Sequence, residues 1–157
     1  MSDATFLTPE AYDKLRAELE QLTSDGRAEI EKRIQEAREH GDLRENADYD
    51  AAKNDQGLME ARIRQLESLL NTAEVRTVEV TDEVVVGSLV TVIDSDGDEM
   101  EFFVAPPENK VAGVLLASPS GPLGRALLGA RPGDDVTYQA PGGNFTVTVT
   151  AVKPYTG

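Results

Sequence analysis

The sequence predicts an α+β protein in which an antiparallel helical hairpin of coiled-coil type precedes a small domain with a mainly antiparallel sheet. Two apolar seams at helical spacing, one on each side of residues 43–46, predict the hairpin. The composition then changes, because seven of the eight prolines and 10 of the 13 glycines fall in residues 77–157. We therefore expect a coiled-coil domain over residues 1–76 and a globular domain over residues 77–157.

The first arm of the hairpin opens with a helix-start signal. Thr8 suits the N-cap, Pro9 suits the first helical position, and Glu10 lies near the positive end of the helix dipole. Residues 23–26 interrupt the seam and predict either a break or a kink. The apolar positions of this arm follow coiled-coil spacing: Tyr12, Leu15, Leu19, Leu22, Ile30, Ile34 and Ala37.

The second arm repeats this pattern, and two such stripes bury each other most economically in an antiparallel hairpin. Pairing about residues 43–46 sets Ile30 near Met59 and Leu15 near Ala73. At about 1.5 Å per residue, arms of roughly 30 residues give a hairpin about 45 Å long. The seam of this arm consists of Ala52, Gln56, Met59, Ile63, Leu66, Leu70 and Ala73.

The globular domain is predicted to combine short strands, tight turns and one short helix. Turn residues at 94–98 and 141–144 favour two hairpins, and residues 121–128 favour a helix that ends before Gly129. The predicted strands cover residues 78–80, 84–86, 87–93, 100–104, 111–117, 136–139 and 145–152.

The composition excludes several classes of protein. With 29 acidic and 15 basic side chains, the chain has a formal net charge of −14 and is not expected to bind duplex nucleic acid through its overall field. It has no cysteine and one histidine, His40, which excludes disulfides and multi-histidine metal sites. No apolar run approaches the roughly 18 residues of a membrane span and no signal peptide opens the chain, so we expect a cytoplasmic protein without a membrane partner.

Two motifs in the globular domain are explained by local structure. Asp94, Asp96 and Asp98 suggest part of a calcium loop, but Gly97 is at the fourth position rather than the sixth, so a turn is the better explanation. Residues 121–125 are rich in glycine, but they lack the lysine and the spacing of a phosphate-binding loop.

The segment between the two seams carries the clearest chemical signal. Asp42 and Glu45 are three positions apart, so both carboxylates can face one point on a helix or turn. Two carboxylates make an incomplete Mg²⁺ site, which other oxygen ligands would have to complete. Helix capping explains the same residues, with Gly41 ending the first arm, and from the residues alone capping is favoured.

At these residues the sequence resembles the GreA/GreB family of bacterial transcript cleavage factors, and the match covers nearly the full chain. Its densest part is residues 34–53, and Ala51-Ala52-Lys53 is nearer to the GreA branch than to the GreB branch. The match also includes residues 7–10, 120–129, 133–136 and 140–143.

The resemblance implies a coiled-coil hairpin joined to a domain of FKBP-like shape, and bacterial RNA polymerase as the partner of a monomeric factor. The globular domain is expected to dock near the rim of the secondary channel, and the hairpin to enter that channel. There Asp42 and Glu45 are expected to hold a Mg²⁺ jointly with the polymerase and to position a water. Backtracked RNA is then hydrolysed and a new 3′ end forms. The factor alone is not expected to be an enzyme.

The resemblance also assigns roles to neighbouring residues. Arg38 and Lys53 match basic positions expected to contact the RNA, while Gly41, Asn46 and Tyr49 are expected to support the tip. The sequence departs from the family at residues 26–28, where the family often has Arg-Pro, and helix continuity is therefore open there.

Two alternative functions remain. One is a secondary-channel regulator that inhibits RNA polymerase without cleavage, although the presence of both Asp42 and Glu45 argues against it. The other is a plain coiled-coil interaction module or an FKBP-like isomerase. An isomerase would need an aromatic-lined pocket, and the adjacent Phe102 and Phe103 are expected to face opposite sides of a strand.

Overall fold

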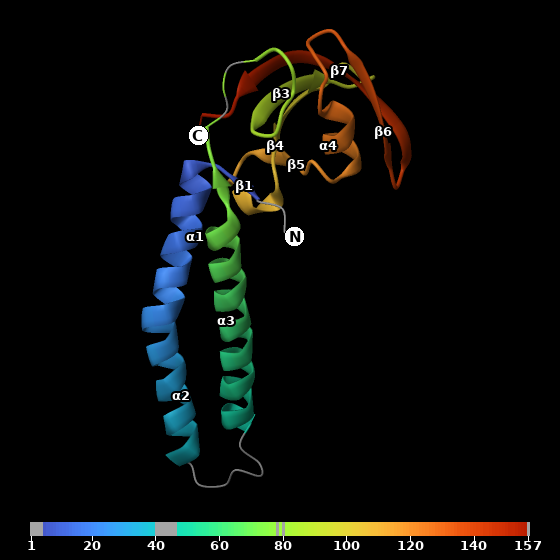
Figure 1. Ribbon diagram of the computed structural model, residues 1–157. Helices are drawn as coiled ribbons and strands as arrows, with labels where there is room; N and C mark the ends of the chain where they lie inside the picture. Colours follow the sequence, from blue (N-terminus) through green and yellow to red (C-terminus); the bar gives the residue numbers. More distant parts are fainter. Residues whose placement is uncertain (1–4, 40–46, 78, 80, 157) are drawn as a thin grey trace. The chain divides into compact units, whose positions relative to one another are not determined.

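The computed structural model describes residues 5–39, 47–77, 79 and 81–156, and it divides into two compact units (Figure 1). The first unit spans Tyr12–Ala73. The second combines the described residues up to Ala11 with those from Glu74 onward. The chain therefore passes between the units twice, after residue 11 and again after residue 73.

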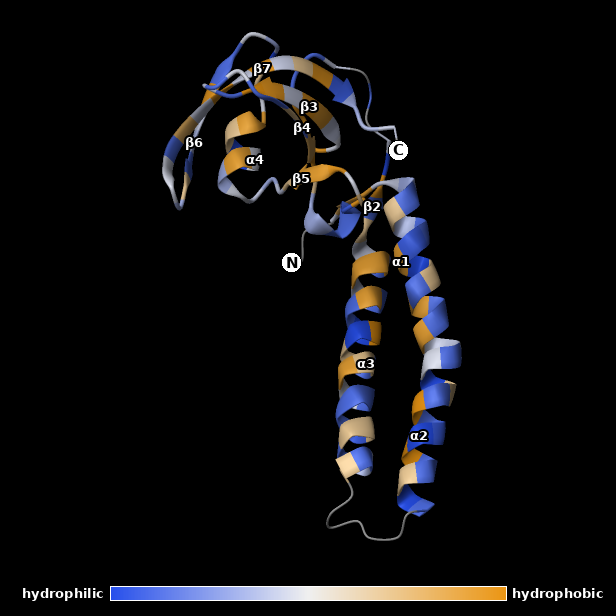
Figure 2. Cartoon of the chain, turned by 180° about the vertical axis from the view of Figure 1, so that it is seen from behind, coloured by the Kyte–Doolittle hydropathy of each residue, from blue (hydrophilic) through white to orange (hydrophobic). Residues whose placement is uncertain are grey.

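The first unit is an antiparallel helical hairpin, as predicted. One arm consists of α1 (Pro9–Gln21), a π-helical turn (Leu22–Gly26) and α2 (Arg27–Glu39), and the other is the 26-residue helix α3 (Ala47–Thr72). In Figure 2 the hydrophobic colour on α1 and α2 lies mainly on the side that faces α3. None of the described helices is both long enough and apolar enough to cross a membrane.

Apolar side chains from both arms form one cluster between α2 and α3. Ile30, Ile34 and Ala52 are buried there, and Tyr49 and Met59 pack against them. The cluster agrees with the predicted placing of Ile30 near Met59. Burial of these side chains is the main force that holds the two arms together, because an isolated helix of this length is only marginally stable in water.

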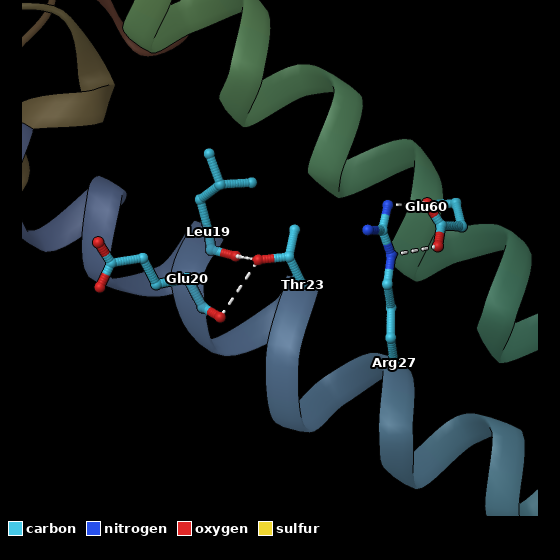
Figure 3. A network of polar contacts seen from close by, with 5 residues as sticks. All are labelled: Leu19, Glu20, Thr23, Arg27 and Glu60. Carbon is cyan, nitrogen blue, oxygen red and sulfur yellow. Dashed lines mark hydrogen bonds and ion pairs between the residues drawn. The ribbon is translucent and has the colours of Figure 1, made fainter.

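The interruption predicted at residues 23–26 is a π-helical turn rather than a break. The backbone N–H of Arg27 donates to the carbonyl oxygen of Leu22, which is the five-residue hydrogen bond of a π-helix. Thr23 Oγ1 donates to the carbonyl oxygen of Leu19 at 2.9 Å (Figure 3). The hydroxyl thus bonds a carbonyl of the preceding turn, and the first arm continues through the distortion into α2.

Ion pairs cross between the two arms of the hairpin. In the pair drawn in Figure 3, Arg27 donates from Nε and Nη2 to the two carboxylate oxygens of Glu60, at 2.9 and 3.0 Å. A second ion pair, between Arg33 and Asp55, also fits the predicted pairing of the arms about residues 43–46. A third ion pair joins Glu18 to Arg62. The predicted pairing would instead set Glu18 opposite a residue nearer to the C-terminal end of α3.

The residues before α1 belong to the second unit. Strand β1 (Phe6–Leu7) pairs in parallel with β2 (Glu74–Val75), a small sheet that the sequence analysis does not predict. Thr8 caps α1 as predicted, because its Oγ1 accepts a hydrogen bond from the N–H of Ala11 at 3.1 Å.

The centre of the second unit is a five-stranded sheet in the order β5-β4-β3-β7-β6 (Figure 1). Neighbouring strands are antiparallel except β4 and β5, which run parallel, so the predicted sheet is confirmed. Its strands are β3 (Ser88–Ile93), β4 (Glu99–Val104), β5 (Leu115–Ala117), β6 (Asp135–Ala140) and β7 (Gly143–Pro154).

Two hydrophobic clusters lie on the two faces of this sheet. The short helix α4 (Pro122–Leu127), which the sequence predicts, packs on one face together with Phe102. On the other face Phe103 packs with Phe6, and its ring stacks on Tyr155 with centroids 4.2 Å apart. The predicted opposition of Phe102 and Phe103 is confirmed. The resulting curled sheet with one short helix is the C-terminal fold that the resemblance implies.

Some predicted strands differ from the structure. Residues 84–86 are not a strand, because Val84 exchanges backbone hydrogen bonds with Gly129 and Ala130 after α4 instead of joining a ladder. The strand predicted at 111–117 shortens to its last three residues, since Gly113 turns the chain at a φ of 83°. Residues 78 and 80 of another predicted strand lie outside the described residues.

Candidate functional site

The predicted functional residues lie in the segment of sequence that joins the two arms of the hairpin, or within the helix ends beside it. Asp42 and Glu45, together with Gly41 and Asn46, are outside the described residues. They belong to the segment of sequence between α2 and α3. The described part of the site therefore consists of the helix ends that flank this segment.

Arg38 and Tyr49 contact each other across these helix ends. Arg38 is in the last turn of α2, and Tyr49 is in the first turn of α3. The guanidinium carbon of Arg38 lies 5.8 Å from the centroid of the Tyr49 ring. This separation is within the range of a cation–π interaction. The structure thus brings together two of the residues to which the resemblance assigns a role.

The Tyr49 ring is supported by the apolar interior of the hairpin. It is half-buried and packs against the cluster of Ile30, Ile34 and Ala52. Such packing restricts the rotamers of a side chain, because protein interiors leave few voids. The surface on which Arg38 lies is therefore fixed by the same contacts that join the two arms.

Lys53 lies one helical turn beyond Tyr49 on α3. Residues four apart on a helix share a face, so both predicted RNA-contacting cations lie on the side of the hairpin that carries Tyr49. The Lys53 side chain is exposed, and its Nζ donates a hydrogen bond to Oε1 of Gln56 at 3.0 Å. This basic pair, Arg38 and Lys53, could contact an anionic backbone at neutral pH.

The cross-arm ion pairs remain charged at neutral pH. A hydrogen bond from the Arg27 guanidinium lowers the pKa of Glu60 below its ordinary value, and Arg62 has the same effect on Glu18. Both carboxylates are thus ionised throughout the physiological range. The ion pairs help to fix the register between the two arms, and this register determines which residues meet at the helix ends.

The acidic group at Asp94, Asp96 and Asp98 forms a turn, as predicted. Oδ1 of Asp94 accepts hydrogen bonds from the backbone N–H groups of Asp96 and Asp98, each at 2.9 Å. One carboxylate oxygen from each residue lies within 4.8 Å of the others. Because Asp94 is already committed to the backbone of the turn, the arrangement is explained by the hairpin between β3 and β4.

A buried residue that no sequence pattern identified holds the segment before α1 within the second unit. Asn109, in the short helix η2 (Pro107–Asn109), is 1% exposed. Its Oδ1 accepts from the N–H of Thr8 at 2.8 Å, and its Nδ2 donates to the carbonyl oxygen of Phe6 at 2.9 Å. These partners are 101 and 103 positions away, so no local pattern could have identified it.

The aromatic side chains of the second unit form separate groups among the described residues, one of which joins Phe6, Phe103 and Tyr155. Phe102 and Phe103 pack on opposite faces of the sheet, and Tyr155 stacks on Phe103. Tyr138 and Phe145 pair separately on β6 and β7, with centroids 5.9 Å apart. The cavity beside Phe6 and Tyr155 has only these two aromatic rings in its lining, together with polar residues such as Glu10 and Arg76, whereas the isomerase alternative needs several rings around one pocket.

Two family models match the chain, one on each side of the boundary between α3 and the sheet. The model described as "Transcription elongation factor, N-terminal" of GreA_GreB matches residues 5–75. The model described as "Transcription elongation factor, GreA/GreB, C-term" matches residues 79–154.

Relatives similar to this chain cover almost all of its length. A "Transcription elongation factor GreA" from Streptomyces coelicolor is 44% identical over 99% of this chain and 96% of its own length. A protein of the same name from Saccharopolyspora erythraea is 45% identical over 99% of this chain and 98% of its own. Among solved structures, GreA factor homolog 1 (Gfh1) of Thermus thermophilus is 30% identical, covers 95% of this chain and 98% of that chain, and has a TM-score of 0.43.

Proposed function

We propose, since this chain belongs to the GreA/GreB family of transcription elongation factors, that it is a transcript cleavage factor acting in the secondary channel of RNA polymerase. RNA polymerase is the partner that the family implies. The factor stimulates hydrolysis of backtracked RNA, and elongation restarts from the new 3′ end. The nuclease activity belongs to the polymerase, and this chain contributes side chains to it.

The antiparallel hairpin is the observation that carries this proposal. Its two arms lead to the segment that holds Asp42 and Glu45. With 26 residues, α3 alone is about 39 Å long. A pair of helices of this length can carry two carboxylates along a channel that excludes a globular domain. The cross-arm cluster and ion pairs keep the two helices together during that insertion.

Asp42 and Glu45 are the proposed Mg²⁺ ligands of this chain, shared with carboxylates of the polymerase. Carboxylate oxygens suit Mg²⁺, and two of them leave positions for ligands from the polymerase, the RNA and water. The bound ion supplies an activated water for hydrolysis. Both residues lie outside the described residues, so their role rests on the family and on carboxylate chemistry.

Arg38 and Lys53 are proposed to contact the RNA backbone. Both are exposed and lie on the side of the hairpin that carries Tyr49. A local cation can bind a phosphate even though the chain as a whole carries a formal charge of −14. The acidic remainder of the molecule disfavours attachment to nucleic acid elsewhere.

Stalled, backtracked elongation complexes supplied with Mg²⁺ provide the test. Wild-type protein should shorten the RNA. Asp42→Ala or Glu45→Ala should lower the cleavage rate by at least about 10- to 100-fold, because losses of that size already follow when a residue that only hydrogen-bonds to a metal ligand is replaced. The exposed Asp13 on α1 offers a matched control, and Asp13→Ala should cleave normally.

Two results would contradict the proposal. If both tip variants cleave like the wild type, the metal-ligand role is wrong. If the wild type slows RNA synthesis and produces no shortened RNA, the chain is an inhibitory regulator of the same channel.

A further inference from the structure

Arg38 differs from the other cross-arm arginines of the described hairpin in the kind of partner it has. Arg27, Arg33 and Arg62 each form an ion pair with a carboxylate on the opposite arm. Arg38 forms no ion pair with a described residue, and its guanidinium lies over the ring of Tyr49 instead. Of these four arginines, the one with the aromatic partner is nearest in sequence to residues 40–46.

The nature of the partner decides what the arginine can still do. A carboxylate neutralises the guanidinium and occupies its N–H donors. An aromatic ring attracts the cation through its quadrupole and leaves the positive charge uncompensated. Arg38 is therefore held in place and still carries a charge that a phosphate can bind.

The packing of the Tyr49 ring against the interior of the hairpin limits where the Arg38 guanidinium can lie. Tyr49 packs against the cluster of Ile30, Ile34 and Ala52, in which buried residues of α2 and α3 meet. An exposed arginine otherwise samples many rotamers, and it loses that freedom when it binds a phosphate. A ring that already restricts those rotamers lowers the entropic cost of binding.

We propose that Tyr49 is a positioning residue that acts through Arg38, holding its guanidinium ready for a phosphate of the RNA. The phosphate ligand rests on the proposed function, whereas the contact itself does not. Lys53, on the same face of α3 as Tyr49, places a second cation on the same side. The ring thereby organises a basic surface at these helix ends without reducing its charge.

A mutant cycle tests this role in backtracked complexes at saturating factor. Tyr49→Leu keeps the apolar packing and loses the ring, and it should lower the cleavage rate about 3- to 10-fold, a range derived from cation–π strengths. Arg38→Ala should lower the rate in the wild-type and Tyr49→Phe backgrounds, and it should have little further effect in the Tyr49→Leu background. Tyr12→Leu on α1 makes the same chemical change in the other arm and should leave the rate unchanged.

A second measurement follows the contact in the free full-length protein. Ring currents should shift the NMR signals of the Arg38 side chain in the wild type and in Tyr49→Phe, and Tyr49→Leu should abolish the shift. Circular dichroism melts verify that each variant is folded. Unshifted Arg38 signals in the wild type would overturn the inference.

The outcomes separate this inference from the proposed function. Additive effects of Arg38→Ala and Tyr49→Leu, with cleavage still lost in Asp42→Ala, would overturn the positioning role alone. Normal cleavage by Asp42→Ala would overturn the proposed function and with it the RNA ligand of Arg38. Non-additive rates together with the lost ring-current shift support the inference.

Discussion

At the scale of single residues, Asn109 shows how one amide can fix a distant segment. Its side chain pairs with the backbone of both Phe6 and Thr8, and it also donates to the carbonyl oxygen of Pro106 at 3.2 Å. No described side chain contains a buried polar atom without a partner. Removal of this amide would therefore create unpaired buried groups in an otherwise satisfied interior.

We predict that Asn109→Ala destabilises the protein by about 2–4 kcal/mol, because it leaves the buried N–H of Thr8 and carbonyl of Phe6 unpaired. Urea unfolding measures the change. The exposed Asn144 in the β6–β7 hairpin is the control, and Asn144→Ala should stay within about 0.5 kcal/mol of the wild type. Equal losses in both variants would show that the buried amide has no special role.

At the scale of the elements, α3 contains a glycine that its packing does not require. Gly57 is exposed, and a Cβ added there meets no atom within 4 Å. Gly57→Ala should raise the stability of the hairpin by about 0.5–1 kcal/mol, because alanine loses less backbone entropy in a helix. A thermal melt followed at helical wavelengths measures this, and a lower melting temperature would contradict the prediction.

The cross-arm ion pairs give the hairpin a dependence on pH. The pKa of Glu60 is lowered in the folded state by its hydrogen bond from Arg27, so ionised Glu60 stabilises the fold above its unfolded pKa. This contribution should disappear as the pH falls below about 4.3, the ordinary glutamate value, and passes through the lower folded value.

Unfolding by denaturant at a series of pH values measures this effect. Glu60→Gln cannot be ionised and should lose less stability than the wild type between neutral and acid pH. The effect is small because the pair is exposed to solvent. Identical pH profiles for the two proteins would show that the ion pair does not contribute.

The elements also show which features a sequence can reveal. The seams of the hairpin, the N-cap at Thr8 and the turn at Asp94 depend on neighbours within a few positions, and all were predicted correctly. The pairing of β1 with β2 joins Phe6 to Glu74, and two-residue strands carry no periodic pattern. Residues 84–86 have strand-like composition, but the backbone after α4 takes their hydrogen bonds.

The same distinction applies to the candidate site. Asp42, Glu45, Arg38 and Lys53 could be named because a family motif marks their positions in the sequence. The contact between Arg38 and Tyr49 required the register of two helices, which depends on the whole apolar seam. The π-helical turn was predicted only as a break or a kink, since the residue types at 23–26 do not distinguish a π-helical turn from either.

At the scale of the whole molecule, the charge determines where nucleic acid can bind. With a formal net charge of −14, the free protein should show no electrophoretic shift of RNA or duplex DNA at physiological salt. Arg38 and Lys53 should contribute only when the polymerase presents the RNA to them. A shift of free RNA that weakens with added salt would contradict this prediction.

The buried contacts of residues 6–8 with Phe103 and Asn109 have a consequence for synthesis on the ribosome. The hairpin is built from contacts within residues 12–73, so its helices can pair as soon as that stretch has emerged. Phe6 must wait much longer, because Phe103 and Asn109 follow about a hundred residues later. Residues 6–8 are thus synthesised before the hairpin but complete their buried contacts only after the hairpin has formed.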